Sequence, residues 1–221
     1  NKIVCLIPAR SGSKRIKDKN IINLGGKPLI YYTISLALKS KMFDEVIVST
    51  DSKIYKKISE KYGSKVILRP KNISKSNSPD IEWIKYTLSK LNKNYEFFFI
   101  LRPTSPFRKI STLKKAWRQF NKGNFDSLRS VQKSQSQPGK MWVIRNDYMF
   151  PLLPFLNNKK IPWHSCQSYE LPEVYLQDAS LEIGKVSKTI KNNSIAGEII
   201  SPYINNALEG FDIKITKQEL I

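Results

Sequence analysis

Cysteine and histidine are scarce in this chain of 221 residues, and long apolar runs are absent. Two cysteines, Cys5 and Cys166, are too few for the disulfide framework of a small secreted domain, so the composition favours a reducing compartment. A single histidine, His164, excludes a metal cage built from several histidines. Without a run of eighteen apolar residues or the three-part organisation of a signal peptide, we expect a cytoplasmic protein without a membrane partner.

Acidic residues are also few, with 18 Asp and Glu against 38 Lys and Arg, and the formal net charge is +20. An excess of this size raises the question of nucleic-acid binding. The basic residues are spread along the chain, however, whereas nucleic-acid-binding domains concentrate them on one face. We therefore expect no nucleic-acid partner, and we expect the diffuse positive field to attract small anions such as a triphosphate.

Strand-like and helix-like segments alternate through the first half of the chain. The expected strands are 3–8, 45–50, 64–68 and 96–101. The expected helices are 28–42, 53–62, 80–91 and 111–120. Short strands at 178–183, 197–200 and 210–213 are expected to return to the same sheet. This order predicts an α/β fold with a doubly wound, mostly parallel sheet in one domain, residues 1–221.

Ligands of such sheets bind beyond the carboxyl ends of the strands. The site is therefore expected on the loops at 9–20, 50–52, 69–80 and 102–108. Residues 134–177 differ from the rest, because they combine many aromatic side chains with several prolines. This segment is too apolar for a linker, and two interpretations stay open. It is either an arm that packs on another subunit or an ordinary extension of the core.

The loop after the first strand reads ARSGSKRIKDKN. Gly12 allows a turn, and Ser11 and Ser13 offer hydroxyl groups. Its cations are Arg10, Lys14, Arg15 and Lys19. Cations and loop N–H groups at a strand end are suited to several phosphate oxygens, although neither the P-loop spacing nor the dinucleotide fingerprint is present. A solvated basic loop is the alternative interpretation.

Further motifs follow in order along the chain. They read NLGGKPLIYYTI from residue 23, FDEVIVSTDS at 43–52, VILRP at 66–70, LRPTSPFR at 101–108 and PEVYLQDASLEI at 172–183. Together with the first loop, they resemble the acylneuraminate cytidylyltransferase family, which makes CMP-sialic acids and related sugars. The resemblance covers nearly the whole chain, because EGFDI at 209–213 also matches.

The resemblance implies a Rossmann-like nucleotidyltransferase that transfers CMP from CTP to an acidic, sialic-acid-like sugar and works as a homodimer. The anomeric hydroxyl would attack the α-phosphate in line and release pyrophosphate. The implied catalytic residues are Arg10, Lys19 and Asp212. The implied nucleotide-binding residues are Ala9, Arg10, Gly12, Ser13, Lys14, Asn20, Arg69, Asp80, Pro103, Thr104 and Ser105.

A divalent cation, Mg²⁺, is expected to bridge the triphosphate, with Asp212 as its ligand. Many family members have Asp-Ile-Asp here, whereas this chain has Asp212-Ile213-Lys214. Glu209 or Asp178 is then a candidate second ligand, and Lys214 a candidate partner for a phosphate or the sugar acid. The alternative for Asp212 is a structural, salt-bridged carboxylate.

Departures from the family near the expected acceptor pocket are Arg102, Gln137 and Asp178, which we interpret as acceptor-binding residues. Arg102, where the family has Gln, is suited to a bidentate pair with an acceptor carboxylate, and a protein ion pair is its alternative. His164 is either a general base for the acceptor hydroxyl or a residue that packs within the arm. Asp51 is interpreted as a helix N-cap.

A first rival function is the transfer of CMP from CTP to a different acceptor: an octulosonate, a pseudaminic or legionaminic acid, or a phosphonate. A non-catalytic nucleotide-binding homologue is the rival that Lys214 favours, because that homologue would have lost its metal site. A basic nucleic-acid-binding module is the third rival, and it predicts salt-dependent binding to arbitrary DNA or RNA.

Overall fold

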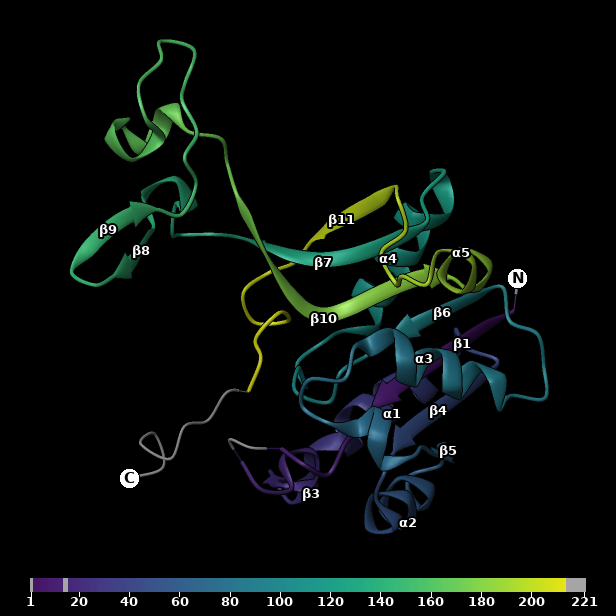
Figure 1. Ribbon diagram of the computed structural model, residues 1–221. Coiled ribbons are helices and arrows are strands. Elements are labelled where there is room, and N and C mark those ends of the chain that lie inside the picture. Colours follow the sequence, from purple (N-terminus) through teal and green to yellow (C-terminus); the bar gives the residue numbers. More distant parts are fainter. Residues whose placement is uncertain (1, 14–15, 214–221) are drawn as a thin grey trace.

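The computed structural model describes residues 2–13 and 16–213. Within these ranges the central sheet has seven strands in the order β11-β7-β10-β6-β1-β4-β5 (Figure 1). They are β1 (Ile3–Pro8), β4 (Glu45–Thr50), β5 (Lys65–Leu68), β6 (Phe97–Ile100), β7 (Ser127–Lys133), β10 (Tyr175–Lys185) and β11 (Ile200–Ile204). Only β10 runs antiparallel to its neighbours, so the mostly parallel sheet is confirmed.

Helices cover both faces of this sheet, as the doubly wound prediction requires. They are α1 (Leu29–Ser40), α2 (Lys53–Lys61), α3 (Asp80–Ser89), α4 (Ile110–Lys122) and α5 (Val186–Asn192). Ile34 of α1 and Leu113 of α4 belong to the apolar cluster on one face, whereas Ile84 of α3 belongs to the cluster on the other. Strand β1 supplies both clusters, with Cys5 in the first and Leu6 in the second. This explains its continuous apolar run, since successive side chains of a strand point to opposite faces.

Two short hairpins and five 3₁₀ turns complete the described elements. The hairpin strands are β2 (Asn23–Leu24) with β3 (Lys27–Pro28), and β8 (Trp142–Arg145) with β9 (Tyr148–Pro151). The turns are η1 (Lys19–Ile21), η2 (Lys71–Ser74), η3 (Pro138–Lys140), η4 (Trp163–Ser165) and η5 (Ser168–Glu170). In the described ranges no helix is both long enough and apolar enough to cross a membrane.

The strand predicted at 210–213 is wrong. Its N–H groups take part in turns instead, with Gly210 N donating to Asn206 O and Phe211 N to Leu208 O, at 3.1 and 3.3 Å. The strand predicted at 197–200 begins only at Ile200, because the N–H groups of Glu198 and Ile199 donate to the Asp126 carboxylate. At 198–199 a side chain far away in the sequence thus occupies donors that a strand ladder would need, whereas at 210–211 nearby carbonyls do so.

The segment between β7 and β10 projects away from the sheet and carries β8, β9 and three of the 3₁₀ turns (Figure 1). Within it, Phe155 packs edge-on against Trp163, and Cys166 is buried. Many of its large apolar side chains are nevertheless exposed, among them Ile144 at 72% and Tyr148 at 71%. We refer to residues 134–174 as the arm.

Candidate active site

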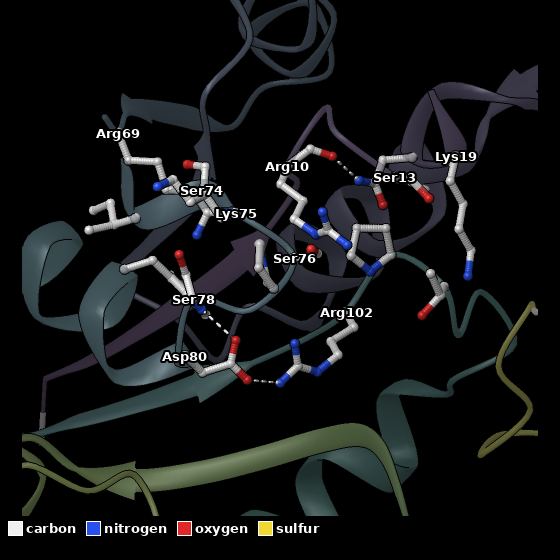
Figure 2. Close-up of a pocket in the computed structure, with 16 residues that line it drawn as sticks. Arg10, Ser13, Lys19, Arg69, Ser74, Lys75, Ser76, Ser78, Asp80 and Arg102 are labelled. Carbon is white, nitrogen blue, oxygen red and sulfur yellow. Dashed lines mark hydrogen bonds and ion pairs between the residues drawn. The ribbon is translucent and has the colours of Figure 1, made fainter. Parts of the chain in front are cut away.

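A cavity of about 500 Å³ opens at the carboxyl ends of β1, β5 and β6 (Figure 2). Strand β1 lies between β6 and β4, so the chain winds outward from β1 in both directions, and ligands of α/β sheets bind at such a switch point. The lining residues are Pro8, Arg10, Ser13, Lys19, Asn20, Arg69, Ile73, Ser74, Lys75, Ser76, Ser78, Asp80, Trp83, Arg102, Pro103 and Thr104. Three of the four loops expected from the sequence therefore meet at one cavity.

The loop after β1 has a hydrogen-bonded conformation in its described part. Arg10 Nη1 donates to Gly12 O at 2.6 Å, and Asn20 Nδ2 donates to Arg10 O at 3.1 Å. Arg10, Ser13, Lys19 and Asn20 line the cavity, as the resemblance implied. This arrangement gathers positive charge and polar donors where an anion would enter.

Of the other predicted nucleotide-binding residues in this loop, Ala9 and Gly12 do not line the cavity, and Lys14 is not described. Ala9 is fully buried and extends the ladder to β4, with its N–H donating to Ser49 O at 2.9 Å. Gly12 is a turn residue whose carbonyl holds the Arg10 side chain. Lys14 and the neighbouring Arg15 lie outside the described residues.

Arg69 is buried at the cavity wall and is 6% exposed. Its guanidinium lies 5.4 Å from the centre of the Trp83 ring, and its Nε has no hydrogen-bond partner. Burial lowers the pKa of Arg69 to about 10, against the opposing effect of Asp51 and Asp80. A buried positive charge at the cavity wall is costly unless an anion compensates it, so Arg69 is suited to an incoming anion.

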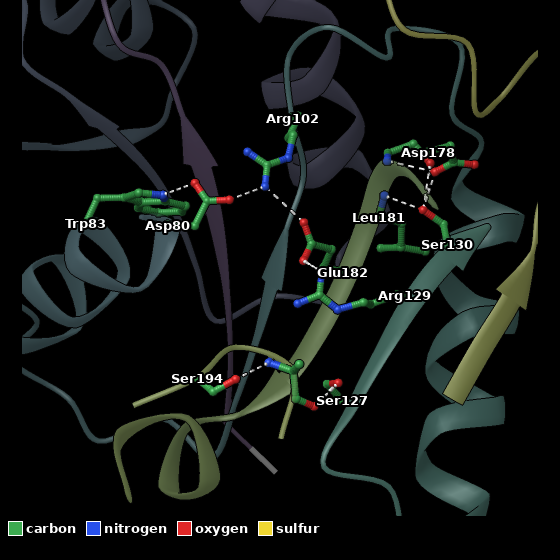
Figure 3. Close-up of polar contacts among 12 residues, drawn as sticks. Asp80, Trp83, Arg102, Ser127, Arg129, Ser130, Asp178, Leu181, Glu182 and Ser194 are labelled. Atoms are coloured by element: carbon green, nitrogen blue, oxygen red, sulfur yellow. Dashed lines mark hydrogen bonds and ion pairs between the residues drawn. The ribbon is translucent and has the colours of Figure 1, made fainter. Parts of the chain in front are cut away.

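Arg102 belongs to a chain of ion pairs that runs from the cavity into the sheet (Figure 3). Its Nη2 lies 2.6 Å from Asp80 Oδ2 and 3.0 Å from Glu182 Oε1, and Arg129 Nη1 lies 3.1 Å from Glu182 Oε2. Burial raises the pKa of Asp80, but the charge and hydrogen bond of Arg102 outweigh it, so that pKa lies below its ordinary value. The structure therefore shows Arg102 paired with carboxylates of the protein itself. Its contact with an acceptor carboxylate stays a prediction.

Residues between Arg69 and Asp80 contribute to the cavity more than the sequence indicated. Ser74, Lys75, Ser76 and Ser78 line it, together with Ile73 and Trp83. The sequence pointed to the loop at 69–80 but to no residue between its ends. The signal was the composition KNISKSNS, which places hydroxyl groups and lysines directly after a strand.

Pro103 and Thr104 line the cavity, whereas Ser105 is 2% exposed and is not among the lining residues. The backbone of Ile213 donates to Thr104 O at 2.9 Å and so fixes the segment that carries Asp212 to this loop. Asp212 Oδ1 lies 4.0 Å from Lys19 Nζ. The segment thus brings a carboxylate to a cation that lines the cavity.

Described residues include no group of three or more His, Cys, Asp or Glu side chains arranged to hold a metal. Glu209 accepts instead from Lys109 N at 3.0 Å and from Asn206 Nδ2 at 2.8 Å. Mg²⁺ in nucleotide sites commonly has one or two protein carboxylates, with phosphates and water completing its shell. Asp212 alone is compatible with that donor set, whereas Lys214 lies outside the described residues.

Two predicted acceptor residues do not line the cavity. Asp178 accepts hydrogen bonds from Ser130 Oγ and from Ser180 N, within a bulge of β10 (Figure 3). Gln137 lies in the arm, where its side chain donates to Pro172 O at 3.1 Å. His164 also lies in the arm and packs on Trp142, with ring centres 4.8 Å apart.

The prediction that Asp51 caps α2 is wrong. Ser52 is the N-cap, since its hydroxyl accepts from Tyr55 N at 3.3 Å. The Asp51 carboxylate accepts from Ser11 instead. Asp51 and Ser52 are both suited to capping α2. Because Asp51 bonds to Ser11 of the loop after β1, Ser52 is the residue that caps the helix.

The fold and the cavity define a nucleotidyltransferase-like α/β domain, and sequence comparison names the family. Residues 4–146 match the cytidylyltransferase family, and the chain belongs to it. The N-acylneuraminate cytidylyltransferase of Escherichia coli O18:K1:H7 is 50% identical over 148 residues, which are 66% of this chain and 35% of that relative. The chain thus matches only about a third of the length of that relative.

Another relative is similar over nearly its whole length. The CMP-N,N'-diacetyllegionaminic acid synthase of Legionella pneumophila is 34% identical over 219 residues, 96% of this chain and 90% of the relative. A solved structure of CMP:2-keto-3-deoxy-manno-octonic acid synthetase complexed with CTP has a TM-score of 0.67 at 16% identity. The alignment covers 94% of this chain and 91% of the chain of that structure. At 16% identity, this similarity supports the fold alone.

Proposed function

We propose that this chain transfers CMP from CTP to the anomeric hydroxyl of a nonulosonic, sialic-acid-like sugar and releases pyrophosphate. The observation that carries the proposal is the cavity at the switch point of the sheet. It combines cations from three loops, among them the Arg69 guanidinium, which is buried at the cavity wall. The names of the relatives, which include N-acylneuraminate, legionaminic acid and pseudaminic acid enzymes, support the choice of reaction and acceptor.

Positioning and charge neutralisation would provide most of the catalysis. Arg10 and Lys19 would bind the triphosphate and stabilise the charge that develops as the bond to pyrophosphate breaks. Arg69 would contact the nucleotide from the opposite wall. A bound Mg²⁺, held by Asp212 and the phosphate oxygens, would add positive charge to the triphosphate. The proposed reaction needs no covalent enzyme intermediate.

The acceptor would bind near Pro103 and Thr104, on the Asp212 side of the cavity. The residues that line this cavity come from the end of β1, from the loops beyond the strands and from the start of α3, and the arm contributes none to the described lining. The nonulosonic acceptor is favoured over an octulosonate because the relatives with sequence similarity carry nonulosonic names. The octonic acid synthetase resembles the chain in fold only.

We also propose that the chain forms a homodimer through its arm. The β8–β9 hairpin exposes Ile144, Tyr148, Met149 and Phe150 by more than half of their surface. Apolar surface of this kind is typical of a contact between proteins.

The free thiols of Cys5 and Cys166, together with the use of CTP, support a cytoplasmic location.

The test is pyrophosphate release with Mg²⁺ from CTP or ATP, across a panel of nonulosonic acids, octulosonates and phosphonates. We expect release with CTP, not with ATP, and with a nonulosonic acid, and we expect Asp212→Ala to reduce it strongly while CTP binding persists. A wild-type chain that does not bind CTP would contradict the proposal. Binding without release across the whole panel would favour a non-catalytic homologue.

A further inference from the structure

The loop that carries Arg10 and Ser13 is attached to the end of the neighbouring strand. Asp51 follows β4 directly, and its Oδ1 accepts from Ser11 N at 2.8 Å. Its Oδ2 accepts from Ser11 Oγ at 2.9 Å. One carboxylate therefore makes two hydrogen bonds to a single residue that lies between two cavity-lining side chains.

A second contact holds the other end of the same loop. The Tyr55 hydroxyl donates to Asp18 Oδ1 at 3.1 Å, and Tyr55 is only 1% exposed. Asp18 has φ 54°, in the left-handed region, and directly precedes Lys19 and Asn20, which line the cavity. A rigid, buried side chain of α2 thus supports the residue from which the chain enters η1.

Neither Asp51 nor Tyr55 lines the cavity itself. Their contacts hold the backbone at Ser11 and Asp18, next to the cavity-lining cations Arg10 and Lys19. A loop already held in one conformation loses less entropy when it binds a ligand, so its affinity is higher. The negative charge of Asp51 would repel a nearby triphosphate. A favourable electrostatic contribution to triphosphate binding therefore does not explain why an aspartate stands at this position.

We propose that Asp51 and Tyr55 are positioning residues that determine how tightly the cavity-lining side chains Arg10, Ser13, Lys19 and Asn20 bind the triphosphate of CTP. The proposal rests on the proposed function, because it assumes that CTP occupies the cavity. It assigns a function to the connection between β4 and α2, which contributes no side chain to the cavity wall.

The experiment compares the dissociation constants of CTP and CMP by calorimetry for the wild type and four variants. Asp51→Ala removes both acceptors, Ser11→Ala removes one donor, and Tyr55→Phe removes only the hydroxyl group. Asp51→Asn is the conservative variant, since its amide oxygen can accept from Ser11 N while its NH2 group donates to Ser11 Oγ.

We expect Asp51→Ala to weaken CTP binding about tenfold, and Ser11→Ala and Tyr55→Phe to weaken it about threefold. CMP binding should change by less than about twofold, because CMP lacks the two phosphates that the loop would hold. Asp51→Asn should restore most of the CTP affinity. Ser52→Ala is the matched control. It removes the cap of α2 and should lower the melting temperature without selective loss of CTP binding.

Several outcomes would overturn the proposal. If the wild type binds CTP but Asp51→Ala and Tyr55→Phe bind it equally well, the connection does not position the loop, and the proposed function stands. Equal loss of CTP and CMP binding, with a lowered melting temperature, would show a structural contribution only and would also overturn it. A wild-type chain that does not bind CTP would overturn this proposal together with the proposed function.

Discussion

The cavity loops and the arm are built in opposite ways. Around the cavity, polar side chains are buried or half-buried and held by partners from distant parts of the sequence, such as Arg102 between Asp80 and Glu182. In the arm, apolar side chains such as Ile144 are exposed, and the described hydrogen bonds are mostly local. The difference indicates that the cavity is organised within one chain, whereas the arm presents a surface suited to another chain.

The largest effect is expected at Arg108, which ties the cavity loop to the core. Its guanidinium donates to Ser180 O at 2.7 Å and to Thr33 Oγ1 and Arg102 O at 2.8 Å. Burial lowers its pKa to about 10. Arg108→Ala leaves two buried acceptors and one part-buried acceptor without this donor, so we expect the free energy of unfolding to fall by about 3 kcal/mol or more. Urea unfolding measures it.

The control for Arg108 is Arg118→Ala on the exposed face of α4, which should change the free energy of unfolding by less than about 0.5 kcal/mol. If both variants are equally stable, buried polar anchoring does not distinguish the cavity region from the rest of the surface.

Gly210 tests the attachment of the segment that carries Asp212. A Cβ atom there would lie 1.9 Å from Gln132 Nε2 and 2.3 Å from Asp178 Oδ2. Gly210→Ala must therefore displace the ends of these two side chains or the segment itself, and we expect kcat to fall about tenfold while CTP affinity changes little. Steady-state pyrophosphate assays measure it. Gly26→Ala is a glycine control, since its Cβ would meet nothing within 4 Å, although its φ of 82° adds local strain. If kcat falls equally in Gly210→Ala and Gly26→Ala, the loss is not specific to the segment that carries Asp212.

The arm is tested by placing a charge on its exposed surface. We expect Ile144→Asp to shift the chain from dimer to monomer in light scattering after size-exclusion chromatography, with the melting temperature of the core domain little changed. Ile54→Asp on α2 is matched to it, because Ile54 is also exposed, at 65% against 72%. Dissociation by Ile54→Asp, or none by Ile144→Asp, would contradict a dimer formed through the arm.

The smallest effect concerns the Asp80–Arg102 pair. The folded protein holds the pKa of Asp80 below its ordinary value of 3.8, so the stabilisation is present above that pH and is lost as the pH falls through the folded-state pKa. Because the Asp80 side chain is partly exposed, we expect no more than about 1 kcal/mol. Asp80→Asn should be less stable than wild type at pH 7 and equally stable near pH 2 in urea unfolding. A difference that does not depend on pH would contradict this assignment.

The sequence alone determined the parallel core and the location of the site. Strands such as β1 and β6 are apolar on both faces, and only a sheet covered by helices on both sides buries such strands. The carboxyl ends of parallel strands meet at one edge, so the loops carrying Arg10, Arg69 and Arg102 were expected together and are together.

Tertiary structure determined the partners of individual polar side chains. Asp51 and Ser52 are equally suited to capping α2, and the proximity of Ser11 decides between them. The late start of β11 likewise depends on the Asp126 carboxylate, which lies 72 residues before Glu198 in the sequence. A hydrogen bond across 40 residues exists only once the sheet order brings its two ends together, and no local propensity encodes that order.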